Sequence, residues 1–448
     1  MSLISFSRVC FLLLGAGLAY ADSPKVFEHE LDNGMKVLVL PDQRAPVVVS
    51  QVWYKVGSSY EHNGITGVSH LLEHMMFKGT EALAPGEFSE TVARFGGSDN
   101  AFTSADYTAY FQTISNEQLD RMLKMEADRM RNINITDEEF AKELEVVKEE
   151  RRQRTDDNPQ SLTYERFREI AYTNSPYQIP IIGWMQDLDS MQPDDARQWY
   201  QQWYAPNNAT LVVVGDVKPE AVFTMAEEHF GPVKTSQIAE LKPQQEVEQL
   251  GLRRIKVKQV AQVPYLIMGF KVPNYKTIDD KQDAYALEVI AGILDAGNSA
   301  RFSQRLVREQ ELATGIGAGY DLYSRLPGLF TITAVPRDQI AVADLEAAIL
   351  AEIDDLKAAK VSRDELQRVK NQVVASDVYE RDSMFYQGMK LGILETVGIG
   401  WQVANEYVDS INAVTPADIQ RVAKTYFNED NLTVAELVPV QANNGDKQ

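Results

Sequence analysis

Apolar positions along the chain follow first a strand-like and then a helical period, and this order occurs twice. In the first half, two β-rich runs and a following helical pattern cover residues 37–40, 47–56 and 66–78. In the second half, the matching segments are residues 255–260, 265–272 and 281–294. Alternation marks half-buried strands, and a 3.6-residue period marks helices. The pattern predicts an α+β fold with two homologous domains, each a mainly antiparallel sheet with helices packed on it.

A longer match near the end of each half indicates an internal duplication. Residues 193–214 and 416–437 align without a gap at a constant offset of 223 residues. In both, a helical pattern starts at a proline, ends at an aromatic pair and leads through a turn into an apolar strand. One helix–turn–strand match can arise by chance, but the gapless length and the position in both halves favour duplication.

The chain length of 448 residues suits two domains better than one compact core. The stretch from about Thr235 to Leu250 is rich in Gln, Glu and Lys and has few apolar anchors, as in a linker. We therefore place the first domain at 22–235, a linker at 236–252 and the second domain at 253–448.

The first 21 residues differ from the rest of the sequence. Arg8 precedes an apolar run from Val9 to Leu18, and the following Ala-Tyr-Ala ends at Ala21. This pattern predicts a secretory signal peptide, with a buried N-terminal helix as the alternative. No Cys follows the cleavage site and no later segment approaches 18 uninterrupted apolar residues, so we expect no membrane anchor. Absence of a cell-wall anchor or retention signal favours a Gram-negative periplasm as the location.

The cysteine content and the net charge limit which metal ligands and which binding partners the chain can have. The only cysteine, Cys10, lies inside the predicted signal, so any metal in the mature chain must be held by His, Asp and Glu. Without Arg8, 43 basic residues face 65 acidic ones, a net charge of −22. Such a charge argues against binding of nucleic acid or of an anionic membrane. It would attract basic peptides, although acidity also serves solubility.

The segment after Thr66 carries the candidate chemistry. Thr66 is the expected N-cap of the helix, and Gly79 its end. At 3.6 residues per turn, His70, Glu73 and His74 share one face. Two imidazoles one turn apart can bind one Zn²⁺, which lowers the pKa of a bound water, and the carboxylate beside them can take its proton. A pair of ordinary histidines is the alternative, weakened because the chain has only five.

A third ligand is expected from the acidic helical segment Thr136–Arg154. Thr136 and Glu139 form a capping-box pattern there, and an apolar stripe marks the buried face. Four carboxylates follow, and spacing alone does not choose among them: Glu143, Glu145, Glu149 and Glu150. One of them would bind the metal, and another could orient a histidine.

The arrangement His70-x-x-Glu73-His74, followed 76 residues later by Glu150, resembles the inverzincin or pitrilysin-type peptidases of family M16. The half-size length is similar to the subfamily of mitochondrial processing peptidase and its bacterial relatives. The resemblance implies the LuxS/M16 metallopeptidase-like fold and one Zn²⁺ per chain, bound by His70, His74 and Glu150. It further implies that Glu73 is the general base and that Glu143 supports a ligand.

Substrate contacts are also implied by this resemblance. The run Gly96-Gly97-Ser98-Asp99-Asn100-Ala101 is similar to a family segment that borders the cleft, so Asn100 and Ala101 would pair with an extended peptide. Family members that act alone carry an Arg and, seven residues later, a Tyr, both of which hold the substrate carbonyl. Arg308 is present here, but Gly315 stands in place of the tyrosine.

Either Tyr320, Tyr323 or a partner chain would therefore supply the missing donor. The resemblance implies a dimer that closes around a chamber, preferably with a related subunit lacking the zinc motif and otherwise a homodimer. We expect an endopeptidase acting on short or unfolded peptides. A non-catalytic, peptide-binding subunit is the alternative, and the intact Glu73 argues against it.

Overall fold

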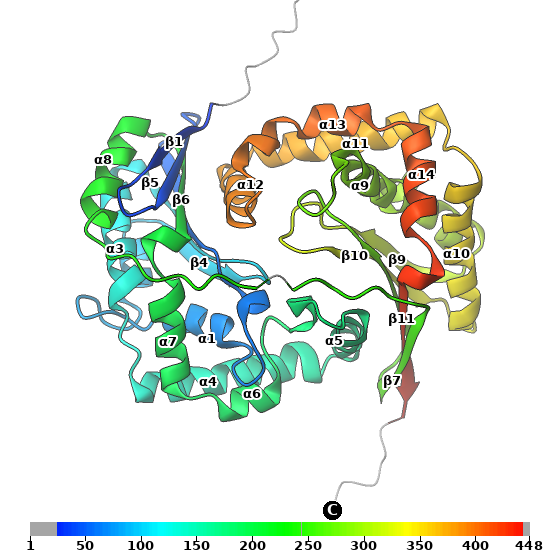
Figure 1. Cartoon of the computed structure of the whole chain (residues 1–448), viewed down its shortest axis with the longest axis horizontal. Coiled ribbons are helices and arrows are strands. Elements are labelled where there is room, and N and C mark those ends of the chain that lie inside the picture. Colours follow the sequence, from blue (N-terminus) through cyan, green and yellow to red (C-terminus); the bar gives the residue numbers. More distant parts are fainter. Residues whose placement is uncertain (1–24, 243, 442–448) are drawn as a thin grey trace, which may run out of the picture.

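The computed structural model describes residues 25–242 and 244–441, and the predicted signal at 1–21 with Cys10 lies outside them. Two sheets stand on opposite sides of the molecule, each with a layer of helices on its outer side (Figure 1). Among the helices of the described residues, none is both long enough and apolar enough to cross a membrane.

The first sheet has six strands in the order β1-β2-β6-β3-β5-β4. Its strands are β1 (Phe27–Glu30), β2 (Lys36–Pro41), β3 (Val47–Tyr54), β4 (Ser98–Thr103), β5 (Thr108–Ser115) and β6 (Ala209–Gly215). Only β2 and β6 are parallel neighbours; the other pairs are antiparallel. Strand β4 therefore lies at one edge of the sheet.

The second sheet repeats this topology in the order β7-β11-β8-β10-β9. Its strands are β7 (Arg253–Val260), β8 (Tyr265–Val272), β9 (Ala313–Gly319), β10 (Gly328–Pro336) and β11 (Leu432–Val440). Again one neighbouring pair, β7 and β11, is parallel. The shared strand order agrees with a duplication, and the predicted α+β class is confirmed.

The α-helices are divided between the two halves. The first half contains α1 (Val68–Met75), α2 (Glu87–Arg94), α3 (Leu119–Asn132), α4 (Asp137–Arg151), α5 (Pro159–Ala171), α6 (Met185–Ser190), α7 (Pro193–Trp203) and α8 (Pro219–Phe230). The second contains α9 (Lys281–Asp295), α10 (Val342–Ala358), α11 (Arg363–Arg381), α12 (Met384–Thr396), α13 (Tyr407–Ala413) and α14 (Pro416–Tyr426). The described residues between Phe230 and Arg253 form no helix or strand, and the predicted domain bounds stay a prediction.

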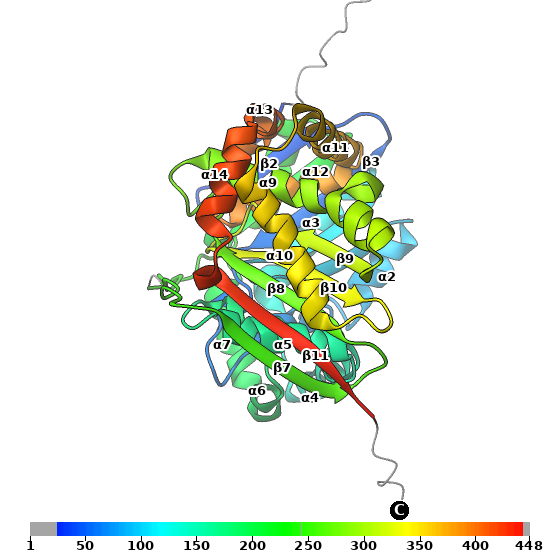
Figure 2. The ribbon, with the colours of Figure 1, turned by 90° about the vertical axis from the view of Figure 1, so that its right-hand side faces the viewer.

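The repeat seen in the sequence corresponds to α7 with β6 and to α14 with β11. Both helices start at a proline in the first turn and carry a capping box. Figure 2 looks onto the second sheet, with α10 and α14 in front of its strands.

One helix of each half covers the sheet of the other half. Helix α12 packs on β3 and β6, where Leu391 joins a buried cluster with Trp53. Helix α5 packs on β7 and β11, where Phe167 joins a buried cluster with Ala435. Helix α12 lies so close to β3 that a Cβ on Gly392 would be 2.1 Å from the Trp53 ring. Because both sheet faces are buried in this way, the two halves are held around a shared interior (Figure 1).

Candidate metal centre

The helix that carries the motif starts later than the sequence predicts. Helix α1 spans Val68–Met75, and its N-cap is Gly67, in the left-handed region at φ 89°. Thr66 does not cap it, so that prediction is wrong: its hydroxyl donates instead to Asp187, at 2.6 Å. Glu61 takes the capping role, because its carboxylate accepts the backbone N–H groups of Gly67 and Ser69 at 2.7 and 2.8 Å. Burial raises the pKa of Glu61 to about 7.

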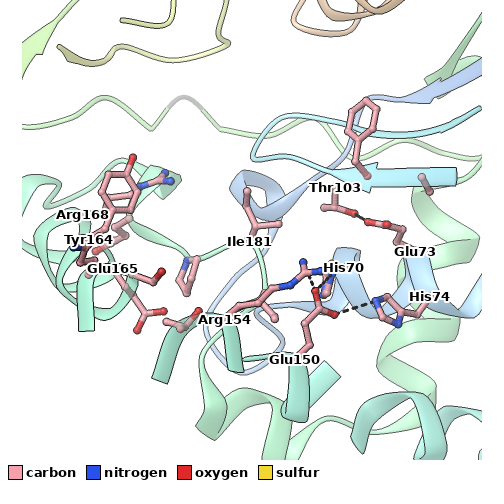
Figure 3. A pocket seen from close by; sticks show the side chains of 18 of the residues that line it. His70, Glu73, His74, Thr103, Glu150, Arg154, Tyr164, Glu165, Arg168 and Ile181 are labelled. Atoms are coloured by element: carbon pink, nitrogen blue, oxygen red, sulfur yellow. Dashed lines mark hydrogen bonds and ion pairs between the residues drawn. The ribbon is translucent and has the colours of Figure 1, made fainter. Parts of the chain in front are cut away.

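Helices α1 and α4 face each other and bring three potential ligands together. One ligand atom each of His70, His74 and Glu150 lies within 4.8 Å of the other two. The Nε2 atoms of His70 and His74 are 3.8 and 3.5 Å from the two oxygens of Glu150. Figure 3 shows Glu150 directed at both imidazoles. Among the described residues, this is the only such group of three or more His, Cys, Asp or Glu side chains.

The structure separates the four carboxylates that the sequence left open. Glu143 lies behind His74, 3.2 Å from its Nδ1, and also pairs with Lys78 at 2.6 Å. Glu145 pairs with Lys148, and Glu149 pairs with Arg152. Of these four carboxylates, only Glu150 lies within 4 Å of the Nε2 atoms of both histidines.

Glu73 lies beside this cluster and is held from the neighbouring sheet. The Thr103 hydroxyl, at the end of β4, donates to Oε2 of Glu73 at 2.6 Å. Burial is the largest influence on this carboxyl and raises its pKa, against the opposite effects of Thr103 and His74. A carboxylate with a raised pKa is a stronger base than an exposed one.

A cavity of about 820 Å³ opens in front of these side chains. Its walls come from α1, β4, the end of α4, α5 and, from the second half, Tyr265. Asn100 and Ala101 line it from the edge strand β4, which pairs with β5 on one side only. The two predicted substrate contacts therefore lie in the same cavity as the cluster of potential ligands His70, His74 and Glu150.

The structure does not bring to this cavity the residues of the second half that were predicted to bind substrate. Arg308 is exposed on the helical turn η7 (Phe302–Glu309), outside the cavity lining. Gly315 lies in the edge strand β9. The Tyr320 hydroxyl donates to the carbonyl oxygen of Pro273 at 2.8 Å, and Tyr323 also lies outside this lining. The residue that would replace the missing tyrosine stays unassigned, and a role for Arg308 stays a prediction.

Two side chains of the site escaped the sequence reasoning. Thr103 follows Asn100 and Ala101 in the strand that the resemblance places at the cleft, but its contact with Glu73 depends on β4 folding beside α1, which no local signal indicates. Arg154 forms an ion pair with Glu150 from the helical turn η3 (Arg152–Asp156). Its spacing of four residues from Glu150 is the usual one for an ion pair on a helix and could have revealed it.

Comparisons with known proteins identify the family of this chain. Residues 36–184 match the family model "Insulinase (Peptidase family M16)", and residues 190–373 match "Peptidase M16 inactive domain". The chain is 32% identical over 443 residues to a protein of Helicobacter pylori named zinc protease PqqE, covering 98% of each. This chain belongs to peptidase family M16.

Another relative and two solved structures also match over most of the chain. A protein of Arabidopsis thaliana, named probable mitochondrial-processing peptidase subunit beta, is 24% identical over 94% of this chain and 79% of the relative. The crystal structure of a protease from Helicobacter pylori matches with a TM-score of 0.88 at 32% identity, covering 93% of this chain and 100% of that one. A Pseudomonas fluorescens M16 inactive-domain structure, at 17% identity, covers 93% of this chain and 98% of that one and shares the fold with a TM-score of 0.83.

The two halves of this M16 chain differ in their histidines. All five lie between His29 and His229, so residues 230–448 contain none. The duplicated fold therefore carries the H-x-x-E-H motif once, in the half that matches the insulinase model.

Proposed function

We propose that this M16 chain is an active zinc endopeptidase that hydrolyses short or unfolded peptides. The observation that supports it best is the convergence of His70, His74 and Glu150 beside the buried Glu73, within one cavity. The names of several relatives, zinc protease among them, support the same reading at the level of the family. Retention of a positioned base favours hydrolysis over binding alone.

The residues present fit a zinc ion. Ligand atoms of a tetrahedral Zn²⁺, each about 2.0–2.1 Å from the metal, lie about 3.3 Å apart. The separations of 3.8 and 3.5 Å between the imidazoles and Glu150 are close to that value. Burial lowers the pKa of His70 to about 3, so this imidazole is neutral and able to donate its lone pair to a metal.

Glu143 orients the second imidazole. Hydrogen bonding between its carboxylate and Nδ1 places the proton of His74 on that atom and leaves Nε2 free towards the cluster. Lys78 pairs with the other oxygen of Glu143 and so fixes the carboxylate itself. The three ligands, Glu143 and Lys78 therefore all come from α1, the turn after it and α4.

A bound zinc would polarise the scissile carbonyl and acidify the attacking water. Glu73 takes the proton of that water and transfers it to the leaving amine, because the carboxylate is buried beside the metal cluster. Thr103 binds Oε2 and holds the carboxylate in one orientation, which leaves Oε1 for the proton. Edge strand β4 aligns the peptide by backbone hydrogen bonds, with Asn100 and Ala101 beside the cleavage point.

Glu73→Gln tests this proposal. The variant should keep one zinc per chain and lose cleavage by at least about 100-fold, since a general base contributes about 10²–10⁴ in rate. His74→Ala should lose the zinc as well. Zinc content is measured by elemental analysis, and cleavage by mass spectrometry of an unstructured peptide mixture.

Glu90→Gln is the matched control, because it removes the same charge from an exposed position on α2. It should match the parent in both measurements. A Glu73→Gln variant that cuts at the parental rate would exclude Glu73 as the base. A zinc-loaded parent that cuts no peptide would favour the non-catalytic subunit. Dimerisation and a periplasmic location stay predictions.

A further inference from the structure

A single arginine of the second half is inserted between two loops of the first half. Arg325, in the connection between β9 and β10, donates from Nε to Oδ1 of Asp106 at 3.1 Å and from its backbone N–H to Oδ2 at 2.9 Å. Its guanidinium also donates to the hydroxyl of Ser59 at 2.8 Å and to the Ser59 carbonyl at 3.2 Å. Asp106 is 3% exposed and the Arg325 side chain 18%, so the contact is a partly buried ion pair between the halves.

Further hydrogen bonds surround this ion pair. The Tyr177 hydroxyl donates to Asp106 and accepts the backbone N–H of Leu326 at 3.0 Å. Asn274 holds the same connection from the other side, donating to the carbonyl oxygens of Ser324 at 3.0 Å and Leu326 at 2.6 Å. A network with this many partners fixes one geometry rather than permitting several.

Both loops held by Arg325 lead to groups of the proposed active site. Ser59 belongs to the turn η1 (Ser58–Tyr60), and the next residue, Glu61, caps the helix that carries the histidines. Asp106 lies three residues after Thr103, the residue that holds Glu73. The guanidinium also lies over the Tyr60 ring, 4.4 Å from its centre, so it contacts η1 through two adjacent residues.

The connection that carries Arg325 also lines a second cavity, which adjoins the cavity of the proposed active site. Tyr320, Asp321 and Tyr323 line a cavity of about 370 Å³ between the halves. This cavity shares Tyr164 and Arg168 with the metal cavity. A movement of the connection would therefore change both the alignment of Glu73 and the shape of the adjoining cavity.

We propose that Arg325 is a positioning residue through which the histidine-free half sets the geometry of the catalytic half. It acts through Ser59 on the N-terminus of α1 and through Asp106 on the end of β4. None of the zinc ligands contacts Arg325, because Arg325 reaches only Asp106, Ser59 and Tyr60. The effect on chemistry rests on the proposed function, whereas the mechanical coupling does not.

Arg325→Met and Arg325→Lys in the full chain test this inference. Arg325→Met should keep its zinc and lower kcat about tenfold or more, since misplacement of catalytic groups by about 1 Å costs on the order of 100-fold. Arg325→Lys keeps a cation for Asp106 but lacks the guanidinium fork that joins Asp106 through Nε to Ser59 through Nη2, so it should recover part of kcat. Hydrogen exchange should rise at residues 57–69 and 98–107 in Arg325→Met.

Arg421→Met is the matched control, because it also removes an ion pair to a buried aspartate, Asp283, but within the second half. It should leave kcat within twofold and leave exchange at 57–69 and 98–107 unchanged. Unchanged exchange in those segments for both Arg325 variants would overturn the coupling, even if the parent cuts no peptide. Raised exchange with parental kcat would overturn the link to chemistry, as would an equal kcat loss in Arg421→Met.

Discussion

Removal of Glu143 is the sharpest test of how the metal cluster is organised. Its side chain is 10% exposed and lies between Nδ1 of His74 at 3.2 Å and the ammonium of Lys78 at 2.6 Å. In Glu143→Gln, the amide oxygen still accepts from His74, but the charge that strengthens that hydrogen bond is lost. In Glu143→Ala, both the acceptor and the charge are lost, and the imidazole is free to rotate.

The expected size of the effect follows from the loss of one supporting carboxylate. Such partners are worth about 10–100-fold in metal affinity, or about 1.4–2.7 kcal/mol. We expect a value near the lower limit for Glu143→Gln and near the upper limit for Glu143→Ala, because only the alanine removes the acceptor. His70 is unaffected by either change, since Glu143 contacts only the other imidazole.

Competition with a chelator of known zinc affinity measures this effect without requiring activity. Glu139→Gln is the matched control on the same helix, one turn earlier, where the carboxylate pairs with Lys142 away from the cluster. Its zinc affinity should equal that of the parent. A Glu143→Ala variant within twofold of the parental affinity would refute the assignment of Glu143 as the support of His74.

Two further predictions concern stability. Gly392→Ala should destabilise the chain in urea denaturation, because overpacking against the buried Trp53 costs about 1–3 kcal/mol, more than the gain of about 1 kcal/mol in helix propensity. Gly388→Ala, whose new methyl group would lie 2.8 Å from the Gln51 side chain, should cost less stability. Equal losses of stability in the two variants would contradict the argument. Burial raises the pKa of Glu61 from 4.5 to about 7, so between these pH values the folded chain binds more protons and stability falls as pH rises, by on the order of 3 kcal/mol. Glu61→Gln should remove that part of the slope of unfolding free energy against pH, and a variant with the parental slope would show that Glu61 is not its source.

Local patterns in the sequence determined much of the fold and the core of the site. The apolar periods located β2, β3, β7 and β8 and the helices α1, α4 and α9, and the gapless repeat at 193–214 and 416–437 became α7 with β6 and α14 with β11. His70, Glu73 and His74 were placed together because spacing along a helix fixes which side chains share a face. The helix boundary was less well predicted, since Thr66 is drawn to Asp187, a residue 121 positions away.

Only the tertiary structure decided what depends on contacts between distant segments. Spacing could not distinguish Glu150 from Glu143, because the two lie on nearly the same face of α4 and differ only in what α1 presents to them. The exchange of α5 and α12 between the sheets, and the insertion of Arg325 beside Asp106, likewise have no local signature. A helix period records that a face is buried but not which half of the chain buries it, so these contacts were fixed only when both sheets had formed.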